Sequence, residues 1–132
     1  MAIQCRNMKE IFGADGLLSR ALRDYEHRPM QEVMANEVQE AIVEGRLSII
    51  EADTGTGKTL AYLIPAALSQ KKTIVSTGTK TLQDQLLEHD VPFLKQHLLK
   101  DLRVVCMKGR ANYLCLFRFQ RALEQQIGRA HV

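Results

Sequence analysis

The pattern of apolar positions along the chain predicts alternating helices and strands. Apolar residues at helical spacing or between helix start and stop signals predict helices over residues 7–24 (two short pieces), 31–43, 58–69, 81–87 and 111–126. Short apolar runs, some rich in β-branched residues, predict buried strands over residues 47–51, 73–76 and 102–107. Because strand and helix alternate, we expect an α/β fold in which a parallel sheet carries helices on its faces.

Prolines and glycines refine the ends of these helices. Pro29 suits the start of the helix over residues 31–43, and Gly45 suits its end. We expect Pro65 to bend the helix over residues 58–69 and Pro92 to interrupt the helix that begins near Thr81.

The composition is that of an ordinary globular protein. The chain has 132 residues, is 45% hydrophobic and 25% charged, and carries a net charge of 18 − 15 = +3. These values exclude a disordered tail, a collagen-like repeat and a disulfide-dense mini-protein. No apolar run approaches the ~18 residues that a membrane helix needs, and residues 1–10 do not resemble a secretory signal. We therefore expect a cytoplasmic protein with reduced cysteines and no membrane contact, and the charge is too small to indicate a partner.

A glycine-rich loop follows the first predicted strand and opens the next predicted helix. It reads Ala52-Asp53-Thr54-Gly55-Thr56-Gly57-Lys58-Thr59, in the strand-loop-helix context that a phosphate-binding loop requires. Gly55 and Gly57 can adopt positive φ and turn backbone N–H groups toward phosphate oxygens. We predict that Lys58 binds the β- and γ-phosphates and that Thr59 binds Mg²⁺. The alternative is a glycine turn with a chance Gly-Lys-Thr.

The acidic partner of such a loop is missing. Phosphoryl transfer needs an acidic residue at the end of another strand to hold Mg²⁺ and to order the attacking water. No apolar run after the loop ends in Asp-Glu. We therefore expect the chain by itself to bind nucleotide weakly or not at all and not to hydrolyse it, and we interpret it as a fragment.

Four sequence elements together resemble the motifs of the DinG/YoaA branch of the XPD-like, superfamily 2 DNA helicases. They are Tyr25-Glu26-His27-Arg28-Pro29-Met30-Gln31 followed by Met34, the loop with Glu51 before it, residues 76–86 (STGTKTLQDQL) and residues 108–115 (KGRANYLC). The resemblance implies a partial RecA-like lobe of an ATP-driven helicase that moves 5′ to 3′ on single-stranded or forked DNA. It also implies an inserted domain with a 4Fe-4S cluster on four cysteines.

The resemblance also implies the residues of an ATP site. They are Arg28 and Gln31 at the adenine end, Thr54, Gly55, Thr56 and Gly57 in the loop, and the catalytic pair Lys58 and Thr59. The alternative for Arg28 and Gln31 is a pair of exposed polar residues at a helix start. Asp53 stands where close relatives usually carry glycine, and we expect its charge to lower the affinity for nucleotide.

Two further segments are expected to bind DNA. Thr77, Thr79 and Lys80 suit phosphate oxygens, although either threonine could instead cap the following helix. Arg110 suits a phosphate and Tyr113 a base, with simple packing as the alternative for Tyr113.

Cys115 matches the first iron–sulfur ligand. Without the resemblance, Cys115 would be interpreted as a buried helical cysteine. One cysteine cannot hold a cluster that needs four thiolates, and we interpret Cys5 and Cys106 as ordinary thiols.

The predicted organisation has four parts. They are an N-terminal helical segment (1–24), the first part of the RecA-like lobe (25–107), the entry to the iron–sulfur domain (108–126) and a non-native tail (127–132), for which an ordinary helix end is the alternative. We expect the N-terminal part of an ATP-dependent DNA helicase. The alternatives are a stand-alone nucleotide-binding or regulatory module and a DNA-binding module without ATP chemistry.

Overall fold

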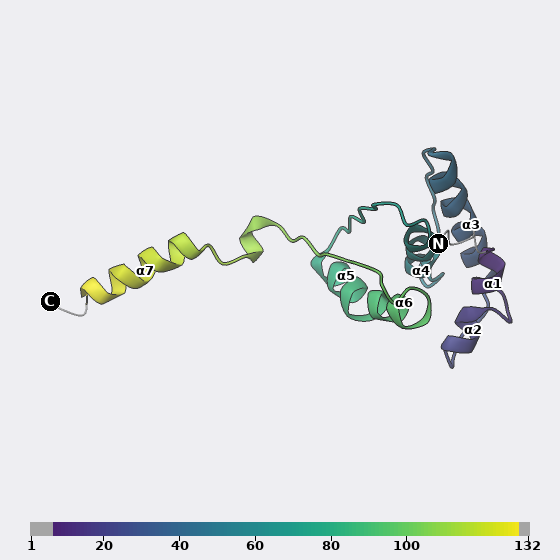
Figure 1. The fold of residues 1–132 in the computed structure, drawn as a ribbon, viewed down its shortest axis with the longest axis horizontal. Coiled ribbons are helices and arrows are strands. Elements are labelled where there is room, and N and C mark those ends of the chain that lie inside the picture. The colour runs from purple at the N-terminus through teal and green to yellow at the C-terminus, as the bar shows by residue number, and fades with distance from the viewer. Residues whose placement is uncertain (1–6, 130–132) are drawn as a thin grey trace.

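The computed structural model describes residues 7–129, and all regular secondary structure in this range is helical (Figure 1). The helices are α1 (Met8–Phe12), α2 (Leu17–Ala21), α3 (Pro29–Glu44), α4 (Lys58–Leu68), α5 (Lys80–Gln85), α6 (Val91–His97) and α7 (Leu116–Arg129), with a π-helical turn η1 (Leu86–Asp90) and a 3₁₀ turn η2 (Arg110–Asn112). None of the helices in the described part of the chain is long and apolar enough to cross a membrane.

The predicted parallel sheet is wrong, because residues 7–129 contain no β-strand. The segments 47–51, 73–76 and 102–107 carry no regular secondary structure, and Figure 1 draws them as coil between the helices. Five of their apolar side chains are 82–92% exposed: Leu47, Ile49, Ile74, Val105 and Met107. A strand forms only when its backbone N–H and C=O groups pair with a neighbouring strand, and these segments do not pair with one another.

A small helical core stands in place of the sheet. Helix α3 packs along α4, and α1 packs against both α2 and α3. The core consists of Met8, Ile11, Phe12, Leu18, Ala35, Ala61, Leu63, Ile64 and Leu94. The hydroxyl of Tyr25 donates a hydrogen bond of 2.6 Å to the carbonyl of Phe12, which ties the segment before α3 to α1. This core holds the N-terminal ends of α3 and α4 side by side, and the phosphate loop leads directly into α4.

Helix α3 confirms the prediction from the apolar pattern and from Pro29. It ends at Gly45, which takes a left-handed conformation with φ 68°. Arg46 then turns back onto the helix, with its Nη1 atom 2.6 Å from Oε1 of Glu37 and its Nε atom 2.7 Å from Oε2 of Glu44. Ser48 donates a further hydrogen bond of 2.7 Å to Glu37. These contacts fix the first residues of the segment that leads to the loop.

Pro92 does not interrupt its helix. The chain runs from α5 through the π-helical turn η1 into α6, and Pro92 occupies the first turn of α6. Proline lacks an N–H group and its ring clashes with the carbonyl four residues earlier, so the wider hydrogen-bonding pattern of η1 relieves the conflict just before it.

Helix α7 begins later than predicted and extends away from the helical body (Figure 1). Residues 110–112 form η2 instead, because their backbone closes the local hydrogen bonds Asn112 N to Gly109 O (2.9 Å) and Tyr113 N to Arg110 O (3.2 Å). Of the predicted tail, residues 127–129 belong to α7, and residues 130–132 lie outside the described residues.

Candidate nucleotide-binding site

The glycine-rich loop adopts the conformation that its sequence predicts. Gly55 and Gly57 have φ of 80° and 74°, in the left-handed region. Thr56 donates its hydroxyl to the carbonyl of Asp53 at 2.9 Å, which closes the loop. Within the described residues, no hydrogen bond uses the backbone N–H groups of Thr54, Gly55 or Thr56. These donors remain available to an anion at the start of α4, where the helix dipole also favours negative charge.

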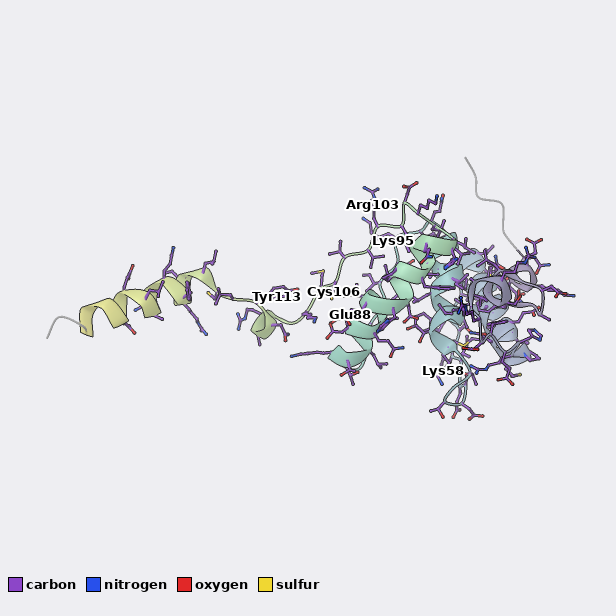
Figure 2. The ribbon with its side chains drawn as sticks, turned by 90° about the horizontal axis from the view of Figure 1, so that it is seen from below. Lys58, Glu88, Lys95, Arg103, Cys106 and Tyr113 are labelled. Carbon is purple, nitrogen blue, oxygen red and sulfur yellow. The ribbon has the colours of Figure 1, made fainter. Side chains whose placement is uncertain are left out.

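Lys58 is the first residue of α4 and folds back over the loop. Its Nζ atom donates to the carbonyls of Ala52 at 2.7 Å and Asp53 at 2.5 Å. Figure 2 shows Lys58 at the loop end of α4. The ammonium group therefore lies at the loop, where a phosphate oxygen can replace the two carbonyls as its hydrogen-bond acceptor.

Two side chains from the start of α3 also hold the loop. Arg28 Nη1 donates to the carbonyl of Gly55 at 2.5 Å, and Gln31 Nε2 donates to the carbonyl of Gly57 at 3.0 Å. Gln31 is only 5% exposed, so the interpretation as a solvent-exposed polar residue does not apply to it. Because these contacts hold the carbonyls of Gly55 and Gly57 toward α3, they favour a loop conformation in which the loop N–H groups remain free to bind an anion. Sequence reasoning missed this role, since no local signal links residues 26 or 27 positions apart.

Gly57 is required for a second reason. A Cβ atom at this position would overlap the side-chain amide of Gln31, whereas a Cβ at Gly55 would meet no atom within 4 Å. The left-handed φ and the close approach of Gln31 both depend on glycine here.

Thr59, the predicted Mg²⁺ ligand, lies half-buried in the first turn of α4. Burial raises the pKa of Tyr62, one turn further along α4, and the Thr59 hydroxyl partly offsets this shift. Burial also raises the pKa of Asp90, and its Oδ2 atom is buried without a hydrogen-bond partner. One hydroxyl fits the Mg²⁺ of a nucleotide complex, in which phosphates and water supply most ligands.

The residues expected to bind DNA lie at the start of α5 and on the segment that leads to α7. Thr79 caps α5, because its hydroxyl accepts from Leu82 N at 3.2 Å, and Thr77 donates to the carbonyl of Thr79 at 3.1 Å. The capping alternative is therefore confirmed for Thr79. Lys80 and Arg110 are exposed. Tyr113 is 57% exposed, and Figure 2 places it on the connection to α7.

The described residues do not fit an iron–sulfur cluster. Cys115 is exposed and lies just before α7, so it is not the buried helical residue that packing alone suggested. Cys106 is half-buried, and Cys5 lies outside the described residues. No group of three or more His, Cys, Asp or Glu side chains in residues 7–129 is arranged to hold a metal. A 4Fe-4S cluster needs four thiolates, and the chain has three cysteines.

A loop with two left-handed glycines, followed by Lys-Thr at a helix start, defines the class of phosphate-binding loop proteins. Residues 28–117 match the DEAD/DEAH box helicase family, and the chain belongs to this family.

Curated relatives narrow the likeness to one group of helicases. The chain is 47% identical over 119 residues to the ATP-dependent DNA helicase YoaA of Escherichia coli, a match that covers 90% of this chain and 18% of the relative. It is 40% identical over 104 residues to the ATP-dependent DNA helicase DinG of E. coli, a match that covers 74% of this chain and 14% of the relative. It is 37% identical over 118 residues to the 3'-5' exonuclease DinG of Bacillus subtilis, covering 86% and 13%. The chain thus spans less than a fifth of the length of these relatives. No solved structure matches it.

Proposed function

We propose that this chain is the nucleotide-binding part of an ATP-dependent DNA helicase. The observation that carries the proposal is Lys58, whose ammonium group lies at the loop carbonyls of Ala52 and Asp53 while the loop N–H groups are free. Lys58 and the loop bind the phosphates, Thr59 supplies a hydroxyl to Mg²⁺, and Arg28 and Gln31 lie toward the adenine end. Thr54 and Thr56 complete the loop with Gly55 and Gly57.

Single-stranded or forked DNA is the proposed partner. Thr77, Thr79 and Lys80 contact phosphate oxygens, Arg110 contacts a further phosphate, and Tyr113 stacks on a base. The exposure of Lys80, Arg110 and Tyr113 supports these roles. The proposed direction of movement is 5′ to 3′ and the proposed location is the cytoplasm, as the resemblance to the DinG/YoaA helicases implies.

Hydrolysis of ATP requires an acidic group beside the phosphate loop. No apolar run after the loop ends in Asp-Glu, and no acidic side chain in the described residues hydrogen-bonds to Lys58 or forms an ion pair with it. Since an acid must hold Mg²⁺ and order the attacking water, we expect the chain by itself to bind ATP only weakly and not to hydrolyse it. We propose Cys115 as one of four cluster ligands in a longer protein, in which Cys115→Ser removes the iron–sulfur absorbance. Absorbance and iron content that persist in that variant would refute this role.

The test measures ATP and single-stranded DNA binding separately on the same variants. We expect Lys58→Ala to weaken ATP binding by roughly 10–100-fold, the value of one charged hydrogen-bonding group, and to leave DNA binding unchanged. Lys95→Ala, which removes an exposed lysine of α6, is the matched control and leaves both unchanged.

Three outcomes would contradict the proposal in different ways. Equal loss of both affinities in Lys58→Ala means that Lys58 supports the fold. ATP binding without any DNA binding by the parent chain favours a stand-alone nucleotide-binding module. DNA binding without ATP binding favours a DNA-binding module.

A further inference from the structure

An ion pair joins the two segments that are proposed to contact DNA. The Nζ atom of Lys108 lies 2.6 Å from Oδ1 of Asp84, which belongs to α5. The two side chains are 31% and 43% exposed, so the pair is partly shielded from water. The ammonium group of Lys108 is therefore paired with a carboxylate of the protein and is not free to bind a phosphate.

A second side chain of α5 reaches the same segment. Gln83 Nε2 donates to the carbonyl of Met107 at 3.0 Å, one residue before Lys108. Neighbouring residues of one helix thus hold neighbouring residues of the other segment. We call these two contacts, Asp84 with Lys108 and Gln83 with Met107, the latch.

The segment held by the latch is closed by its own hydrogen bonds. The backbone N–H of Lys108 donates to the hydroxyl of Tyr113 at 2.9 Å, and the side-chain amide of Asn112 donates to the carbonyl of Gly109 at 2.9 Å. Residues 108–113 therefore form one compact turn that carries Arg110 and the exposed ring of Tyr113. Moving Lys108 moves the whole turn.

The surroundings of the turn suit a polyanion. Residues 102–123 contain five basic residues and no acidic residue: Arg103, Lys108, Arg110, Arg118 and Arg121. Lys80 lies three to four residues before the latch on α5, a rise of roughly 5–6 Å along the helix. Asp84 is the acid that the latch brings next to this basic segment, and an unpaired carboxylate there would repel phosphate.

We propose that Asp84 is a positioning residue for single-stranded DNA: together with Gln83 it holds the turn of residues 108–113 beside α5, so that Arg110 and Tyr113 contact the same strand as Lys80. The inference rests on the proposed function, since it assumes that this surface binds DNA. Beyond that function, the inference assigns to the acidic residue Asp84 a favourable effect on DNA affinity.

The sign of one substitution tests this role. Asp84→Asn removes a negative charge and frees Lys108, so simple electrostatics predicts tighter binding of DNA. It also predicts a steeper salt dependence, because one added phosphate contact increases the slope of log K against log salt concentration by about 0.7. Positioning predicts the opposite. We expect Asp84→Asn to weaken binding of an oligo-dT by about two- to fivefold, the value of a partly exposed ion pair, with a shallower salt dependence.

Two further variants complete the experiment. Glu88→Gln neutralises an exposed acid one helical turn further on and is the matched control, for which binding is unchanged or slightly tighter. Exchange of the charges, Asp84→Lys with Lys108→Asp, restores the ion pair in reverse and recovers the parental affinity. Thermal unfolding of each variant shows that it remains folded.

The outcomes separate the latch from the proposed function. Binding by Asp84→Asn that equals or exceeds that of the parent overturns the positioning role of Asp84, while DNA binding by the parent still stands. Failure of the charge exchange to recover the affinity lost in Asp84→Asn also overturns the role. A parent chain that binds ATP but no oligo-dT refutes the DNA part of the proposed function, and the latch role with it.

Discussion

The Nζ atom of Lys58 lies 2.5 Å from the backbone oxygen of Asp53, a loop residue whose own side chain is exposed. The loop thus carries a cation over its backbone and an anion at its surface. A bound triphosphate gains from the first and is repelled by the second, and solvent screens the repulsion because the carboxylate is exposed.

Neutralising Asp53 should therefore improve nucleotide binding modestly. We expect Asp53→Asn to tighten ATP binding by about two- to fivefold at low salt. The gain should be lost at high salt, because salt screens the repulsion between the exposed Asp53 carboxylate and the phosphates. Titration with a fluorescent ATP analogue at two salt concentrations measures both. Asp24→Asn, an exposed acid outside the loop, serves as the control. Unchanged affinity at low salt would refute the repulsion.

Gln31 should affect both the loop and the base. Loss of its bond to the Gly57 carbonyl in Gln31→Ala is expected to weaken ATP and GTP binding alike by about fivefold, the value of one hydrogen bond. Loss of an adenine contact adds a further decrease for ATP alone. The two dissociation constants separate these effects. If neither nucleotide binds more weakly, Gln31 has no role in the site.

Gly57 and Gly55 form a matched pair for measuring the approach of Gln31. Both have left-handed φ, but only at Gly57 does an added Cβ overlap another side chain. We expect Gly55→Ala to lower the free energy of unfolding by ~1–2 kcal/mol through backbone strain, and Gly57→Ala to lower it by a further ~1–3 kcal/mol through the overlap. Chemical denaturation of the two variants tests this difference. Equal losses would show that Gln31 moves aside freely.

The contacts of Glu37 predict a dependence of stability on acid. Hydrogen bonds from the Arg46 guanidinium and the Ser48 hydroxyl lower the pKa of Glu37 from 4.5 to about 2. Because the pKa in the folded state lies below that in the unfolded state, the ionised carboxylate stabilises the fold above pH 4.5, and this stabilisation is lost as the pH falls toward 2.

Glu37→Gln should therefore lower the thermal unfolding midpoint at pH 7, and the difference from the parent should narrow between pH 4.5 and pH 2. Glu40→Gln is the control, since Glu40 lies 3.5 Å from Arg46 rather than 2.6 Å, and we expect it to have a smaller effect. A difference between Glu37→Gln and the parent that is independent of pH would mean that packing, and not ionisation, accounts for the loss of stability.

Helix α3 and the conformation of the phosphate loop could be predicted because their signals are local. Pro29 and Gly45 bracket α3 within one run of chain, and Gly55, Gly57 and Lys58 occupy positions whose backbone requirements follow from residue type. The cap formed by Thr79 was also foreseen as an alternative, since a cap involves only the next few residues.

Contacts between distant segments were decided only by the tertiary structure. The apolar residues of segments 47–51, 73–76 and 102–107 favour strands, but strand formation requires a neighbouring backbone, and residues 7–129 bring no two of them together as partners. The contacts that do form, between Gln31 and Gly57 and between Asp84 and Lys108, were likewise decided by the tertiary structure. Residue type and local spacing thus determined which groups are candidates for binding phosphate, whereas three-dimensional packing determined what holds those groups in place.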